Sequence, residues 1–212
     1  MPGIALVVGH TTAARGNAIP GAVDAPFTEW EYNLVLANQV HALLQDRGVP
    51  AVVLLRSPRS GYQEAAKAVA REANRWGASL VVEFHCNGAP FTLKANRTEG
   101  VHLPGSVRGA ALAKAVAKAV ASVQGWAYKV IAQARSWNGP TRTGPDGKPL
   151  PGGPPLYILQ DTQAPAVILE SSFFSMGADH QAAPGLDKAL ASLADGTLAK
   201  AVADALIAHL SV

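Results

Sequence analysis

Two histidines stand at the ends of short apolar runs that are typical of buried strands. His10 follows the run 4–8 after one glycine, and His85 directly follows the run 80–84. A catalytic zinc ion takes three protein ligands from His, Asp and Glu and leaves a fourth position for water. If the two strands are neighbours in one sheet, both imidazoles project from the same edge. We therefore expect His10 and His85 to hold one Zn²⁺ per chain.

The third ligand should be an acidic residue, and two candidates follow the Gly- and Pro-rich loop at 11–27. Glu29 and Glu31 both lie in the first turn of a helix expected at 29–47, with Thr28 as its N-cap. Residues two apart on a helix point about 200° apart, so the two side chains do not face one metal together. A first-turn glutamate also stabilises the helix dipole without any metal. The residues alone leave the choice open.

A further carboxylate, Glu170, ends the apolar run 166–169. A carboxylate at such a position is costly unless it is paired, hydrated or near a metal. We expect Glu170 to act as a general base that takes the proton of the attacking water and returns it to the leaving amine, while zinc polarises the carbonyl. The alternative is a glutamate that caps the strand and pairs with a neighbouring cation.

The elements that must position these residues alternate along the chain. Strand patterns occur at 4–8, 51–55, 80–84, 101–103, 156–159 and 167–169, and helical patterns at 29–47, 62–76, 110–123 and 198–210. This order predicts an α/β fold: one three-layer domain over 1–212, with a mostly parallel twisted sheet of about six strands flanked by helices. Ligand sites of such sheets lie at the carboxyl ends of strands. Residues 125–155 lack periodicity and are expected to form an irregular flap beside the site.

Composition narrows the functional classes. The chain has 212 residues, 49% of them hydrophobic, which suffices for one full core. The net charge of +3 includes no run of five or six like charges, so nucleic acid is not indicated. One cysteine, Cys86, excludes an internal disulfide and a cysteine-built zinc site. The first ten residues lack the pattern of a signal peptide, and no stretch approaches 18 apolar residues, so we expect neither an export signal nor a membrane span in the chain as written.

Four motifs in order resemble those of the zinc-dependent N-acetylmuramoyl-L-alanine amidases of the amidase-3 type. They are Val7-Val-Gly-His10, Glu29-Trp-Glu-Tyr-Asn33, His85-Cys-Asn87, and the pair Leu156-Tyr-Ile-Leu159 and Pro165-Ala-Val-Ile-Leu-Glu170. The resemblance spans nearly the whole chain and implies a phosphorylase/hydrolase-like fold. It assigns zinc to His10, Glu29 and His85 and the catalytic carboxylate to Glu170, and so chooses Glu29 over Glu31.

Some positions depart from the family pattern. Thr11 follows His10 where a glycine is common, and Glu83 and Cys86 stand beside His85 where small residues are usual. Glu83 shares a strand face with His85, so it is either an acceptor for an imidazole N–H or a competing ligand. Cys86 points to the other face and is expected in the core.

The resemblance implies hydrolysis of the amide between the lactyl group of N-acetylmuramic acid and the L-alanine of the stem peptide, with peptidoglycan as the partner. The arginines of the expected flap, Arg135 and Arg142, are candidates for contacts with stem-peptide carboxylates. We expect a monomer that acts on the cell wall, in the periplasm or outside the cell, as a phage or prophage lysin does. Two alternatives are a zinc amidohydrolase or carboxypeptidase of small peptides or acylamino acids, and an inactive wall-binding protein on the same fold.

Overall fold

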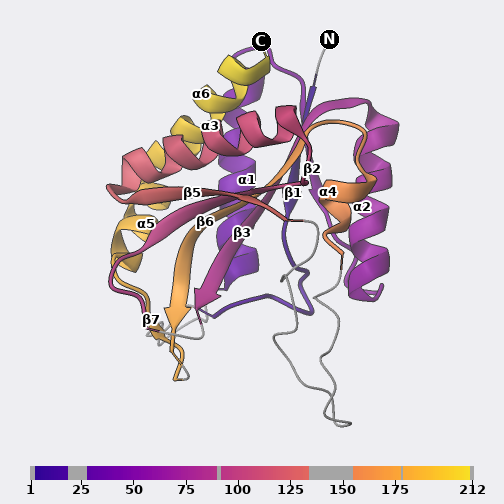
Figure 1. The fold of residues 1–212 in the computed structure, drawn as a ribbon. Helices are drawn as coiled ribbons and strands as arrows, with labels where there is room; N and C mark the ends of the chain where they lie inside the picture. The colour runs from indigo at the N-terminus through magenta and orange to yellow at the C-terminus, as the bar shows by residue number, and fades with distance from the viewer. Residues whose placement is uncertain (1–2, 19–27, 90–91, 134–154, 178, 211–212) are drawn as a thin grey trace.

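The computed structural model describes residues 3–18, 28–89, 92–133, 155–177 and 179–210. Helices and strands alternate over most of this length (Figure 1). The strands are β1 (Gly3–Val8), β2 (Ala51–Leu55), β3 (Ala78–Ala89), β4 (Arg97–His102), β5 (Ala127–Ala132), β6 (Ala166–Met176) and β7 (Gln181–Ala182). The helices are α1 (Glu29–Asp46), α2 (Tyr62–Trp76), α3 (Val107–Gln124), α4 (Tyr157–Asp161), α5 (Leu186–Ala194) and α6 (Thr197–Leu210).

All the strands belong to one mixed, mostly parallel sheet with the order β2-β1-β3-β6-β4-β5. Strand β1 pairs in parallel with β2 and β3, and β3 pairs in parallel with β6. Strand β4 runs antiparallel to β6 and parallel to β5, and the short β7 pairs with the end of β6. The expected single α/β domain is confirmed, and so is the expectation that the two histidine-bearing strands are neighbours.

The two faces of the sheet carry different helices, as Figure 1 shows: α1, α3 and α6 cover one face, and α2 and α4 lie on the other. Strand β3 alternates between them. Leu80, Val82 and Phe84 pack into the larger cluster with α1, α3 and α6, whereas Val81 packs into the smaller cluster with α2 and α4. By this alternation Glu83 and His85 point to the same face as Val81.

Two sequence expectations are wrong, and one helix was missed. The run 156–159, expected as a strand, lies mostly in α4, because Ile158 and Leu159 are buried beside α2 and a run of four apolar residues does not distinguish the two periods. Residues 127–132, expected in the irregular flap, form the edge strand β5, whose exposed Tyr128 and Val130 give no buried-strand signal. Helix α5 was not expected. The rest of the flap, 134–154, with Arg135 and Arg142, lies outside the described residues.

Strands β3 and β6 are longer than their apolar runs, and this corrects where the site residues lie. The last residue of β1, Val8, pairs with Phe84, so His85 is the first residue of β3 beyond the end of β1. Strand β3 continues to Ala89 and β6 to Met176, and the two stay paired past His85 and Glu170. Both residues therefore lie within long strands: His85 lies just beyond the level where β1 stops, and Glu170 lies at the end of the β4–β6 register. In the described residues no helix is long and apolar enough to cross a membrane.

Candidate metal centre

His10 is held at the end of β1 by an unusual backbone. Its φ is 64°, in the left-handed region that residues with a side chain rarely adopt. The preceding residue, Gly9, donates its N–H to the carbonyl of Phe84 on β3. A Cβ on Gly9 would lie 2.5 Å from Nε2 of His85, so only glycine lets the two strands and the second histidine come this close. The turn thus brings His10 beside His85.

Glu29 is the first residue of α1; its side chain lies beside the two histidines and is 1% exposed. Its carboxylate is fixed by backbone and side-chain donors. Oε1 accepts the N–H of Cys86 at 2.9 Å, and Oε2 accepts both the backbone N–H of Asn17 at 3.0 Å and its side-chain amide at 2.9 Å. These bonds orient the carboxylate toward the two histidines.

The donor atoms of these three residues converge. Nε2 of His10 lies 2.9 Å and Nδ1 of His85 3.0 Å from Oε1 of Glu29, and the two imidazole rings are 4.8 Å apart. Within the described part of the chain, this is the one group of three or more His, Cys, Asp or Glu side chains with ligand atoms within 4.8 Å of each other. Two imidazole nitrogens and one carboxylate oxygen form the donor set of many catalytic zinc sites, so these residues fit such an ion.

The pKa shifts of Glu29 and His85 both favour the charged form of the group. Burial raises the pKa of Glu29, but the contacts with His10 and His85 outweigh it and hold this pKa well below its usual range. Burial lowers the pKa of His85, yet the hydrogen bond to Glu29 and the nearby carboxylate of Glu83 leave it well above the ordinary value. The carboxylate is therefore ionised and available as a ligand.

The rival Glu31 has a different task. Its Oε2 accepts the backbone N–H of Thr28 at 2.7 Å and the Thr28 hydroxyl at 2.8 Å, which completes a capping box at the start of α1. Its Oε1 accepts from Arg15 at 3.2 Å. The two oxygens of Glu31 are thus occupied away from the histidines.

The other rival, Glu83, lies behind His85 and is 1% exposed. One oxygen accepts from Nη2 of Arg56, and the other lies 3.7 Å from Nε2 of His85, the ring nitrogen that faces away from Glu29. Burial raises the pKa of Glu83, but Arg56 and then His85 lower it to about 2. The structure therefore places Glu83 on the far side of the imidazole from the ligand cluster.

Glu170 pairs in the sheet register with His85 on one side and with Glu99 of β4 on the other. Its Oε2 is buried and has no hydrogen-bond partner among the described residues. Burial, opposed by His85 and reinforced by Glu29 and Glu99, raises the pKa of Glu170 to about 8. A cation at the three ligands would favour the ionised form of this carboxylate.

Two cavities flank the centre on the α2 side, and the exposed ring of Tyr62 lines both. The first, of about 150 Å³, lies beside His85 and Glu170 and is called the inner cavity below. Its other lining residues are Glu83, Val101, Gln133, Leu156 and Ile168. The second, of about 160 Å³, lies beside the His10 turn; its other lining residues are His10, Thr11, Ala13, Ala14, Arg56, Pro58, Ser60 and Ala65.

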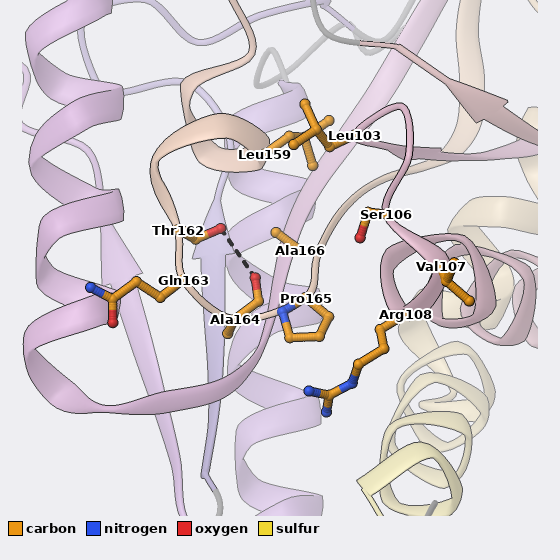
Figure 2. Close-up of a pocket in the computed structure, with 10 residues that line it drawn as sticks. All are labelled: Leu103, Ser106, Val107, Arg108, Leu159, Thr162, Gln163, Ala164, Pro165 and Ala166. Atoms are coloured by element: carbon orange, nitrogen blue, oxygen red, sulfur yellow. Dashed lines mark hydrogen bonds between the residues drawn. The ribbon is translucent and has the colours of Figure 1, made fainter.

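A third cavity lies at the start of β6, away from the carboxyl ends of the strands (Figure 2). It measures about 330 Å³, and Ser106, Arg108 and Gln163 contribute polar groups to it. The hydroxyl of Thr162 on its wall donates to the carbonyl of Ala164 (Figure 2) and also to the carbonyl of Ile158. Its lining includes no candidate ligand or catalytic residue, so it is not part of the metal centre.

Sequence reasoning missed several residues of the site. Asn17 braces Glu29 and also donates to the carbonyl of Cys86 at 2.9 Å, but it stands in a loop with no pattern. Glu99 contacts Arg97 at 2.6 Å and Asn87 at 3.1 Å, and nothing in the sequence marks it. Arg56 had a usable signal: it is a charged residue directly after the apolar run 51–55, the pattern that identified His85.

The comparisons with known proteins concern the family and the fold. Residues 4–208 match the family described as N-acetylmuramoyl-L-alanine amidase. Among curated proteins no significant match is found. Solved structures with the same fold include the catalytic domain of the CD27L endolysin targeting Clostridia difficile, with 20% identity, a TM-score of 0.69, and coverage of 98% of this chain and 97% of that one.

Two further solved structures share the fold. The catalytic domain of the amidase CwlV from Bacillus (Paenibacillus) polymyxa has 20% identity, a TM-score of 0.65, and coverage of 100% and 99% of the two chains. The amidase Ami1 of Mycobacterium smegmatis has 19% identity, a TM-score of 0.65, and coverage of 99% and 98%. Because the family match spans nearly the whole chain and the fold agrees, the chain belongs to the N-acetylmuramoyl-L-alanine amidase family.

Proposed function

We propose that this peptidoglycan amidase is a zinc enzyme in which His10, Glu29 and His85 hold one Zn²⁺ and Glu170 is the catalytic base. The observation that carries the proposal is the convergence of the three donor atoms around Oε1 of Glu29. Zn²⁺ at these ligands would lower the pKa of a water molecule and polarise the scissile carbonyl. The resemblance of the sequence motifs to the amidase-3 type supports the same four residues.

Glu170 is suited to move the proton of the reaction. It lies beside His85 in the sheet register and lines the inner cavity, so it borders the space that a scissile amide would enter. As a carboxylate it accepts the proton of the attacking water, and as an acid it donates that proton to the leaving α-amino group of L-alanine. Its partnerless oxygen is available for both steps.

Glu83 and Arg56 position His85 in this proposal. A histidine that binds a metal through one nitrogen usually gives its other N–H to a carboxylate, which fixes the tautomer and the ring orientation. Nδ1 of His85 faces Glu29, and Nε2 faces Glu83 at 3.7 Å. Arg56 in turn holds the Glu83 carboxylate. Glu83 therefore serves as the acceptor behind the ligand, and not as a fourth ligand.

The substrate bond is the amide between the lactyl group of N-acetylmuramic acid and L-alanine, and the action is on the cell wall. The fold shared with the CD27L endolysin is consistent with a phage or prophage lysin. We keep the monomer as an expectation, which light scattering on the purified chain would check.

Digestion of purified sacculi tests the function. The zinc-loaded chain should release stem peptides with new alanine amino termini and leave the glycan strands intact, as read by mass spectrometry and reducing-end assays. Chelated protein should release none, and added Zn²⁺ should restore release. Failure to take up zinc would contradict the metal site and favour the inactive wall-binding alternative. Hydrolysis of small acyl peptides with no release from sacculi would favour the small-peptide amidohydrolase instead.

A further inference from the structure

Arg56 is a buried cation beside the candidate metal centre, and two of its nitrogen atoms contact no acceptor among the described residues. It directly follows β2 and is only 5% exposed. Nη2 donates to Glu83, but Nε and Nη1 are buried and have no hydrogen-bond partner among the described residues. A buried donor without a partner is destabilising, and more so when it is charged. Such an unused donor needs an explanation, and a ligand group is one.

The guanidinium is held in place by groups on two sides. Glu83 binds one edge, and the ring of Tyr62 lies with its centroid 5.1 Å from the guanidinium carbon. A guanidinium fixed in this way loses little conformational freedom when it binds a ligand. Its free donors are therefore preorganised.

The cavity beside Arg56 is the second of the two that flank the centre. It is lined by the metal-ligand candidate His10, and its walls include Thr11 and Ser60, which carry hydroxyls. The Oγ1 of Thr11 already accepts the N–H of Ala14, so its hydroxyl hydrogen is free to be donated. At about 160 Å³ the cavity is roughly half the lower limit of about 300 Å³ for pockets that hold a whole small molecule. It therefore suits one group of a larger ligand.

We propose that this cavity is a subsite for a carboxylate of the substrate, bound by Arg56. Guanidinium donors and hydroxyls select an anionic oxygen ligand, and charge-assisted bonds of this kind are the strong ones in proteins. The inference rests on the proposed function: because the cavity borders His10, its carboxylate belongs to a stem-peptide residue close to the scissile amide. In this proposal one side of the Arg56 guanidinium binds the substrate, and the other side binds Glu83, which faces His85.

A pair of soluble substrates tests the subsite in the zinc-loaded wild type. The two are muramoyl dipeptides that differ only at the second residue, whose α-carboxyl group is free in one and a carboxamide in the other. A hydrogen bond to a charged group contributes about 1.5–3 kcal/mol, so kcat/KM should favour the free carboxylate by about 10-fold or more. Equal kcat/KM values for the two substrates would overturn the proposal.

Variants then test whether Arg56 causes the preference for the free carboxylate. In the double variant Arg56→Met with Glu83→Gln, which leaves neither charge unpaired, the substrate ratio should fall to about one. In Arg56→Lys, which retains the charge beside Glu83 but loses the fixed fork, the ratio should fall partway. Arg59→Met, at an exposed arginine three residues away, should leave both the ratio and the activity unchanged. A full preference in the double variant would contradict the role of Arg56.

The two proposals fail in different ways. Zinc-loaded wild type that cleaves neither dipeptide would contradict the proposed reaction. Calorimetric binding of both dipeptides to the same protein would still report on the subsite: tighter binding of the free carboxylate, lost in the double variant, supports it, and equal binding overturns it. Zinc content and thermal melting of each variant distinguish a lost subsite from a lost fold.

Discussion

The two faces of β3 differ sharply within a few residues. On the face toward α1, α3 and α6, Val82, Phe84 and Cys86 are buried in an apolar cluster. On the opposite face the alternating positions are Glu83 and His85. Strand β6 repeats the pattern, with Leu169 on the apolar face and Glu170 beside His85 in the register.

The two faces therefore have different roles: the apolar face contributes to stability, and the face with Glu83 and His85 carries the groups that could do chemistry. The apolar face buries side chains that need no partner, and each buried side chain of this size contributes about 1.5–3 kcal/mol. The polar face gathers Glu83, Glu170 and Glu99, with Glu29 arriving from α1, in a region where isolated carboxylates are costly. Arg56 and Arg97 offset part of this charge. A divalent cation at the proposed ligands would offset more.

The largest effect should come from removing Glu29, the proposed carboxylate ligand. In Glu29→Ala the two histidines lose the oxygen that lies about 3 Å from each, so zinc content should fall close to zero. Activity should fall by more than the roughly 10²–10⁴-fold that a general base contributes. Metal analysis after purification and sacculus digestion measure the two effects.

Glu31→Ala is the matched control, two residues away on the same turn. It removes half of the capping box and should lower the free energy of unfolding by about 1 kcal/mol, with zinc content and activity retained. Zinc loss in Glu31→Ala alone would overturn the choice of Glu29.

Much of this arrangement could be predicted from the sequence because periodicity reports burial. The runs before His10 and Glu170 are continuous and apolar, and the run before His85 is apolar except for Glu83, so these three strands were predicted. Thr28 was found as an N-cap because threonine is favoured directly before the first helical residues, and the structure adds that Glu31 completes a capping box. These signals are local.

What the sequence could not reveal depends on pairing between distant segments. Strands β3 and β6 extend beyond their apolar runs because each is paired with the other there, not because of their own residues. Strand β5 was missed because it is an exposed edge. The role of Glu83 remained open between ligand and support, since only the position of Arg56 in three dimensions separates the two.

The second effect concerns Glu170, the proposed catalytic base. Glu170→Gln keeps the shape of the side chain but removes its ability to take a proton, so kcat should fall by about 10²–10⁴-fold while zinc content stays unchanged. Because the wild-type carboxylate is buried beside Glu99 and near Glu29, the melting temperature should be equal or higher in the variant. Near-normal turnover would mean that another group is the base.

The smallest effect tests the apolar face at the residue between Glu83 and His85. Phe84 is fully buried in the cluster with α1, α3 and α6, and Phe84→Leu leaves part of that space unfilled. Its free energy of unfolding should fall by about 1–3 kcal/mol in urea titrations, while zinc content and kcat at a temperature where the variant is folded stay as in wild type. Leu55→Ala, at an apolar residue 52% exposed on β2, should change stability by no more than about 0.5 kcal/mol. Loss of zinc in folded Phe84→Leu would show that the two faces are coupled, and that the packing under β3 sets the position of His85.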